Sequence, residues 1–209
     1  MKRVFSLLLT SFLCLALLSS CDIDVIKMIS NDKNSIGKTA NTAITTYDAL
    51  KENFALRKME GYSLYGAKLS VNSENVGKYT YVYTDKRPDE AKYSDILVVE
   101  VNTLNGKIEK FSAPDYSVYK QEPYEMIKTA MPLDMSNFAI DSDEAMRIAA
   151  KCHFGNDFVY NFIEIIAVYE NGAPVYKVNH ISLVNECIYK TVVDAMTSDV
   201  VSISVEELE

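Results

Sequence analysis

Two copies of one sequence pattern constrain the fold of this chain more than any other feature. Residues 139–146 read AIDSDEAM, and residues 43–50 read AITTYDAL, a diverged version of the same opening. Residues 193–200 read VDAMTSDV, and residues 101–108 read VNTLNGKI, a diverged version of the same ending. A segment repeated with both its opening and its ending predicts two structural units of the same kind.

Each copy predicts one helix followed by several strands. In the second copy Ser142 is the expected helix N-cap, Asp143 and Glu144 are acidic first-turn residues, and Gly155 ends the helix. The first copy has Thr45 or Thr46 as its expected N-cap. Apolar alternation predicts strands at 62–71, 79–84, 95–101 and 107–111 in the first copy, and at 158–169, 174–183, 187–193 and 200–205 in the second.

Asn-Gly pairs at 105–106 and 171–172 predict type I′ turns between neighbouring antiparallel strands. The expected fold class is therefore α+β, with two tandem units that each pack one helix on a three- to four-stranded antiparallel sheet. We place the first unit at 42–112 and the second at 139–209. Residues 113–138 form a connector with a short helix between them.

The N-terminus has the composition of a secretion signal. Lys2 and Arg3 precede an apolar run at 4–18, which is too short to span a membrane comfortably. The Leu-Ser-Ser-Cys stretch at 18–21 resembles the lipobox of bacterial lipoproteins, in which a signal peptidase cleaves before the cysteine and its sulfur carries a diacylglycerol. The alternatives are an ordinary secretory leader with a chance cysteine, or an uncleaved anchor.

The lipobox resemblance implies a signal peptide at 1–20, a lipidated Cys21 and a tether at 21–41. The protein would then sit at the bacterial cell envelope, anchored to a membrane by lipid and facing outside the cytoplasm. More than one acyl chain is needed for stable anchoring, and the lipobox cysteine provides this.

The second copy also resembles a PepSY domain. In that family a helix that opens Ile-x-x-x-Glu-Ala precedes a strand pair and an ending Val-Asp-Ala-x-Thr-Gly-x-Val. The residues that match are Ile140, Glu144, Ala145, Val193, Asp194, Ala195, Thr197 and Val200, with Ser198 where the family has Gly. The first copy matches through Ile44, Asp48, Ala49, Val101, Asn102, Asn105, Gly106 and Ile108.

This resemblance implies two PepSY-like, cystatin-like modules without catalytic activity. In other proteins such modules are linked to peptidase inhibition or to local protein interaction, and a tandem pair is similar to the architecture of beta-lactamase inhibitory proteins. The implied partner is an envelope or secreted protein, with a peptidase as one class. The alternative is a small-ligand or peptide carrier that uses the groove between the repeats.

Charge and motif content favour the same function class. The net charge is −8, and loss of Lys2 and Arg3 with the leader makes the mature chain about −10, so we expect no nucleic acid partner. Serine-hydrolase, Walker and Rossmann motifs are absent from the sequence, and we expect neither an enzyme nor a cofactor. His153 and His180 lack the spacing of zinc-site ligands, so we expect no metal.

Two sets of side chains have alternative interpretations. Cys152 and Cys187 form either a disulfide outside the cytoplasm or two buried free thiols. Tyr79, Tyr81 and Tyr83 share one face of a predicted strand and form either an interface or the core under a helix. Core is the favoured interpretation of the tyrosines, which leaves the sheet edge as the expected partner site, through strand addition.

Overall fold

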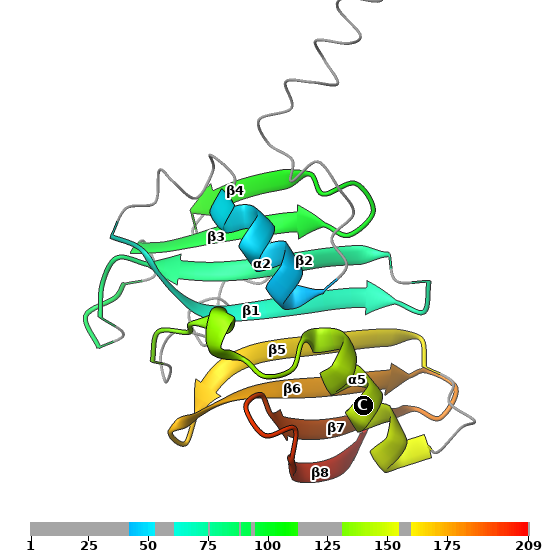
Figure 1. Cartoon of the computed structure of the whole chain (residues 1–209). Coiled ribbons are helices and arrows are strands. Elements are labelled where there is room, and N and C mark those ends of the chain that lie inside the picture. The colour runs from blue at the N-terminus through cyan, green and yellow to red at the C-terminus, as the bar shows by residue number, and fades with distance from the viewer. Residues whose placement is uncertain are drawn as a thin grey trace, which may run out of the picture. The chain divides into compact units, whose positions relative to one another are not determined.

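The structure is a computed structural model that describes residues 42–52, 61–74, 76–87, 89–92, 95–112, 131–154 and 160–208. All of them belong to one compact unit, Asn34–Glu209. Their strands form one antiparallel sheet in the order β4-β3-β2-β1-β5-β6-β7-β8, and the helices α2 and α5 cover one face of it (Figure 1).

The chain passes twice through the same order of elements, one helix and then four strands. The first half contains α2 (Ala43–Glu52), β1 (Ser63–Asn72), β2 (Gly77–Thr84), β3 (Ile96–Asn102) and β4 (Ile108–Ser112). After the 3-10 helix η3 (Met135–Asn137), the second half contains α5 (Ser142–Phe154), β5 (Phe162–Glu170), β6 (Ala173–Ser182), β7 (Cys187–Asp194) and β8 (Val200–Glu207). All eight strands predicted from apolar alternation are present, with ends shifted by a few residues.

The prediction of two separate helix-on-sheet units is wrong, because the first strands of the two halves pair with each other. β1 and β5 run antiparallel over seven residue pairs, from Gly66↔Val168 to Asn72↔Phe162. The core is continuous across this seam, since Leu69 of β1 and Ile165 of β5 belong to one buried cluster. The two halves therefore form one body with one sheet.

The helix N-termini also differ from the prediction. α2 begins at Ala43, so Thr45 and Thr46 lie inside the helix and do not cap it. The hydroxyl of Ser142, the expected cap of α5, instead accepts a hydrogen bond from the Ala43 amide of α2 at 2.9 Å. The start of α2 thus depends on Ser142 of the second half, and the sequence of the first copy alone does not reveal this dependence.

The two predicted Asn-Gly turns have different structures. Asn171 and Gly172 have φ of 51° and 87°, which confirms a type I′ turn between β5 and β6. Before β4, only Gly106 has positive φ, so the type I′ prediction for Asn105–Gly106 is wrong. The hairpin is present but has a longer loop, closed by a hydrogen bond from the Asn102 amide to the Lys107 carbonyl at 3.0 Å.

Candidate functional site

The tyrosines of β2 lie in the core and not at an interface. Tyr79, Tyr81 and Tyr83 are all buried, because their strand lies under the helices and the three rings face them. The Tyr81 hydroxyl donates to the Ala43 carbonyl of α2 at 2.8 Å. Burial raises the pKa of each phenol well above its ordinary value, so the rings stay neutral and hold the helices to the sheet.

The cysteine and histidine candidates lie around the C-terminal part of α5. Cys152 is exposed on that helix and Cys187 is half-buried at the start of β7, and both are free thiols in the structure. His153 Nε2 lies 2.9 Å from Thr191 Oγ1, while His180 is buried beneath the ring of Phe154. In the described part of the chain, no group of three or more potential ligands is placed to hold a metal ion. Oxidation of the two thiols to a disulfide stays a prediction.

The lipidation site and several neighbouring predictions lie outside the described residues. These are the signal peptide at 1–20, Cys21 with its tether at 21–41, and the connector helix within 113–130. Within the described ranges, no helix is long and apolar enough to cross a membrane.

An open pocket lies at one end of the seam between β1 and β5. Its volume is about 340 Å³. The lining residues are Ser70, Val71, Asn72, Val76, Phe162, Ile163, Glu164 and Ile181, from both halves of the chain. Because β1 and β5 pair directly, this seam pocket takes the place of the groove expected between two repeats. Both halves of the chain contribute residues to its lining.

Phe162 is the exposed aromatic residue of the seam pocket. Its side chain is 46% exposed, whereas the next residue, Ile163, is fully buried in the core cluster. Side chains alternate across a strand, so Phe162 points away from the helices. It pairs with Asn72 on β1 and with Ile181 on β6, which fix its backbone on both sides.

Two asparagines brace the loops around the seam pocket. The Asn161 carbonyl accepts from the Ser73 amide at 3.1 Å, and its side-chain oxygen accepts from the Leu183 amide at 2.7 Å. Asn72 Oδ1 accepts from the amides of Glu74 and Val76, both at 3.0 Å. The pocket wall is therefore built from hydrogen-bonded turns and is pre-organised.

Gly77 allows β2 to begin in close contact with the end of β1. A Cβ atom at this position would lie 1.9 Å from the Ser70 carbonyl oxygen, a backbone atom that has no room to move away. The Gly77 amide donates to Thr103 Oγ1 at 2.9 Å. Glycine is thus required at position 77, directly after Val76, which lines the seam pocket.

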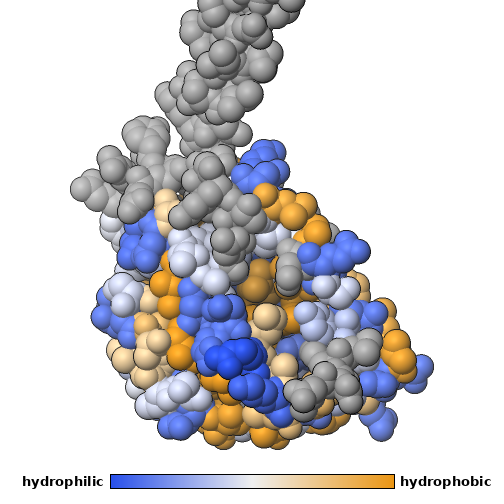
Figure 2. Space-filling view, turned by 45° about the vertical axis from the view of Figure 1, so that its right-hand side comes forward, coloured by the Kyte–Doolittle hydropathy of each residue, from blue (hydrophilic) through white to orange (hydrophobic). Residues whose placement is uncertain are grey.

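The surface of the protein mixes apolar and charged residues. Figure 2, which shows the helix side of the sheet with the right-hand side of Figure 1 brought forward, has apolar residues in orange among hydrophilic ones. Near the pocket, Lys68 of β1 and Glu164 of β5 form an ion pair of 2.8 Å across the seam. A buried apolar centre with a charged rim is the usual anatomy of a protein interface.

Phe162 was missed as a site residue from sequence. It lies within the predicted strand at 158–169, where no residue was assigned to either face from the sequence. The position of Phe162 in the strand sets it apart from the core residues. Ile163, Ile165 and Ala167 are buried on one face of β5, whereas Phe162 lies on the other face, with Glu164. A large aromatic residue on the more exposed face of a strand is the feature that could have identified it.

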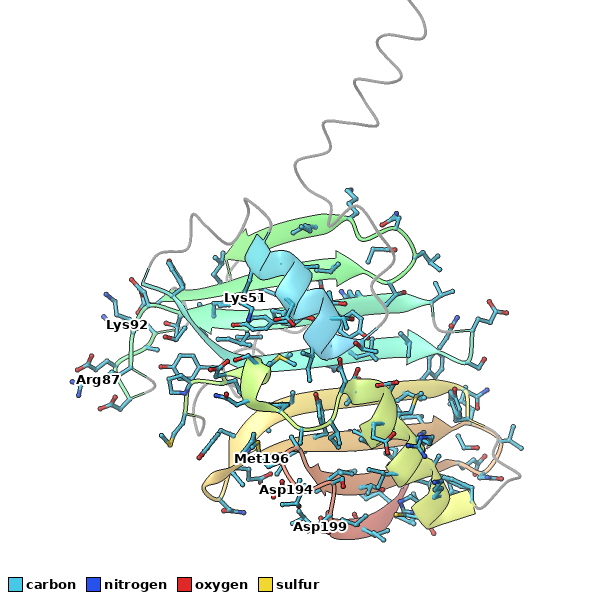
Figure 3. The ribbon with its side chains drawn as sticks, viewed as in Figure 1. Lys51, Arg87, Lys92, Asp194, Met196 and Asp199 are labelled. Carbon is cyan, nitrogen blue, oxygen red and sulfur yellow. The ribbon has the colours of Figure 1, made fainter. Side chains whose placement is uncertain are left out.

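Edge strand β8 is the second exposed apolar surface. Val201, Ile203 and Val205 are 60%, 52% and 54% exposed, and every residue of the strand is solvent-accessible. Asp194 ends β7, and Met196 and Asp199 lie in the loop between β7 and β8 (Figure 3). In the part of the chain that the structure describes, no strand pairs with the outer edge of β8.

Comparison with known proteins gives one structural similarity. The chain matches no model of a known protein family and no curated protein sequence. A solved structure of a protein described as a lipoprotein, from Clostridium difficile 630, aligns with 14% sequence identity and a TM-score of 0.47. The alignment covers 77% of this chain and 92% of that chain. A similarity of this size does not support a shared function.

Proposed function

We propose that this chain is a non-enzymatic lipoprotein that acts outside the cytoplasm and binds an envelope or secreted protein through the seam pocket. The observation that carries the proposal is the half-exposed ring of Phe162, fixed on a central strand at the edge of an apolar pocket. Aromatic residues on rigid elements are typical anchors of protein interfaces. A peptidase is the partner class that the PepSY resemblance implies, and inhibition is the corresponding role.

The interaction is tested by capture from native envelope extracts with the tagged full chain. Phe162→Ser removes the ring but leaves the backbone pairing, and we expect at least about tenfold less captured partner, as for an interface hot spot. Leu104→Ser is the matched control, because Leu104 is also an exposed apolar residue but lies in the loop before β4. Equal capture by the wild type and Phe162→Ser contradicts the proposal.

The inhibitory role is tested on the captured protein. If it is a peptidase, added full chain lowers its rate of peptide hydrolysis, and Phe162→Ser lowers it less. Hydrolysis by the chain itself that is lost in His153→Ala or His180→Ala would contradict the non-enzymatic assignment.

A small-ligand function has one observation in its favour, which is that both halves of the chain contribute walls to the seam pocket. Native mass spectrometry of the chain purified from its envelope separates the two functions. A bound small molecule that is lost in Phe162→Ser favours carriage, and a protein partner in a one-to-one complex favours interaction.

The lipid anchor has a separate test. Cys21→Ala removes the sulfur that carries the diacylglycerol, so we expect unprocessed precursor of full length to accumulate. The measurement is the mass of the protein in membrane and medium fractions. Mature protein of normal mass in the medium contradicts lipidation.

A further inference from the structure

Two turns flank Phe162, and Asn161 holds both of them. The turn between β1 and β2 donates its Ser73 amide to the Asn161 carbonyl, and the turn between β6 and β7 donates its Leu183 amide to the Asn161 side chain. Both turns lie at the end of the sheet where β5 begins (Figure 1). Hydrogen bonds thus join the surface on either side of the seam pocket.

Each turn adds exposed apolar side chains to this surface. Val76 of the first turn is exposed and lines the seam pocket with Phe162. In the second turn Leu183 is exposed, and the neighbouring Val184 is 75% exposed. We call Val76, Phe162, Leu183 and Val184 the apolar row.

Each turn also carries an exposed glutamate, Glu74 in the first and Glu186 in the second. Neither carboxylate forms an ion pair with another residue that the structure describes. By contrast, Lys68 of β1 and Lys78 of β2 each pair with a glutamate. The two turns of the apolar row therefore carry negative charges that these lysines do not balance.

We infer that the partner binds this surface with a basic amphipathic segment. Its apolar side chains lie on the apolar row, and its lysine or arginine side chains lie beside Glu74 and Glu186. The inference rests on the proposed function and names the chemistry of the partner. Complementary charge at the rim of an interface speeds association and disfavours partners of the wrong charge. The net charge of −8 attracts a basic segment over a longer range.

The sheet topology determines how such a segment binds. The seam pocket lies between β1 and β5, which are central strands in the order β2-β1-β5-β6. Strand addition needs the unpaired main-chain groups of a sheet edge, so it does not operate here. The segment therefore binds through side chains, as an amphipathic helix does when its apolar face enters a groove.

Two synthetic peptides test the charge requirement with the full chain. Both are amphipathic helices with the same leucine face, and the opposite face carries lysines in one peptide and glutamates in the other. By calorimetric titration in low salt, we expect the lysine peptide to bind at least about tenfold more tightly. Its addition is expected to shift the NMR signals of Val76, Phe162 and Leu183.

Charge reversal tests the two glutamates one at a time. Glu74→Lys and Glu186→Lys are each expected to weaken binding of the lysine peptide about tenfold in low salt. In 1 M sodium chloride, where the screening length is about 3 Å, the loss falls below about twofold. Asp199→Lys is the matched control, because it makes the same charge change at an exposed residue of the β7–β8 loop, at the opposite end of the sheet. It is expected to change binding by less than about twofold.

Equal affinity for the two peptides overturns the inference. So does a loss in Asp199→Lys that equals the loss in the two glutamate variants, or a lysine peptide that shifts NMR signals away from the apolar row. Circular dichroism of each variant confirms that it is folded.

Capture from envelope extracts separates this inference from the proposed function. If Phe162→Ser loses the partner while Glu74→Lys and Glu186→Lys capture it like the wild type, the seam pocket is the interface and the basic segment is refuted. If Phe162→Ser captures the partner like the wild type, the proposed function fails and the inference fails with it.

Discussion

The carboxylate of Asp141 joins the N-termini of both helices. It accepts hydrogen bonds from the Ile44 amide at 2.9 Å, the Thr42 hydroxyl at 2.5 Å and the Ser142 amide at 2.6 Å. The first amides of a helix have no partner within the helix, and the helix dipole favours a negative charge there. One residue between the two halves therefore supports both helices.

We predict that Asp141→Ala lowers the free energy of unfolding by about 2–3 kcal/mol, because several charge-assisted hydrogen bonds are lost together. The measurement is urea denaturation followed by circular dichroism. Asp143→Ala is the matched control, since Asp143 is an exposed acidic residue in the same first turn, and we expect a loss below about 1 kcal/mol. Equal losses in the two variants would show that Asp141 has no special role.

A second residue-scale prediction concerns His180. Burial, with a smaller contribution from the charge of His153, lowers the pKa of His180 to about 4 from its ordinary 6.5. Between pH 6.5 and about pH 4, His180 is therefore protonated in the unfolded chain and neutral in the folded chain. The free energy of unfolding falls as the pH is lowered through this interval. We expect this group to contribute a loss of about 3 kcal/mol over that interval.

The measurement is the free energy of unfolding at pH 7.5 and pH 4 for the wild type and for His180→Leu. Carboxylates titrate in the same interval, so the difference between the two proteins isolates the histidine. The variant is expected to lose about 3 kcal/mol less than the wild type on acidification. An identical loss in both proteins contradicts burial of His180.

At the scale of elements, the loops that end the two halves have the same hydrogen bonds. Asn102 Oδ1 accepts from the amides two and three residues on, at 2.9 and 3.2 Å, and Asp194 Oδ1 does the same at 2.7 and 2.9 Å. The left-handed position is Gly106, with φ of 66°, in the first loop and Ser198, with φ of 64°, in the second. The repeated sequence ending therefore corresponds to a repeated loop.

A reciprocal exchange at these positions tests the equivalence. Ser198→Gly removes the steric cost of a left-handed residue and is expected to raise the free energy of unfolding by about 0.5–1 kcal/mol. Gly106→Ser introduces the same cost and is expected to lower it by about 1 kcal/mol or more. Thermal and urea unfolding of the two single variants provide the measurement. Effects of the same sign would show that the two loops differ.

The strands were predictable from sequence, whereas one turn and the start of a helix were not. The pattern of apolar residues located all eight strands, and in β5 and β6 it corresponds to a core-facing side that is more buried than the other. The type I′ prediction failed at Asn105–Gly106, where the Asn102 side chain organises a longer loop around the same glycine. The predicted start of α2 failed because its first amides bond to Asp141 and Ser142 of the other half, and local sequence carries no signal for such a partner.

At the scale of the whole molecule, the pairing of β1 with β5 decides the architecture. This contact is made by backbone groups, which are the same in every residue, so side-chain patterns do not reveal it. Ala67 and Ala167 face each other in the register with buried side chains, but the same pattern fits two sheets that each face their own helix. Repetition in sequence therefore predicted the strands and their order within each half, and did not predict that the halves share one sheet.

Amide hydrogen exchange, resolved by residue with NMR, tests the single sheet most directly. If β1 and β5 pair as the structure describes, consecutive amides through Gly66–Asn72 and Phe162–Val168 bond to a strand on one side or the other, and all are protected. If the halves carried separate sheets, both strands would be edges, and every second amide in them would exchange within minutes. Uniform slow exchange along both strands is the result we predict, and alternating fast exchange would contradict the fold.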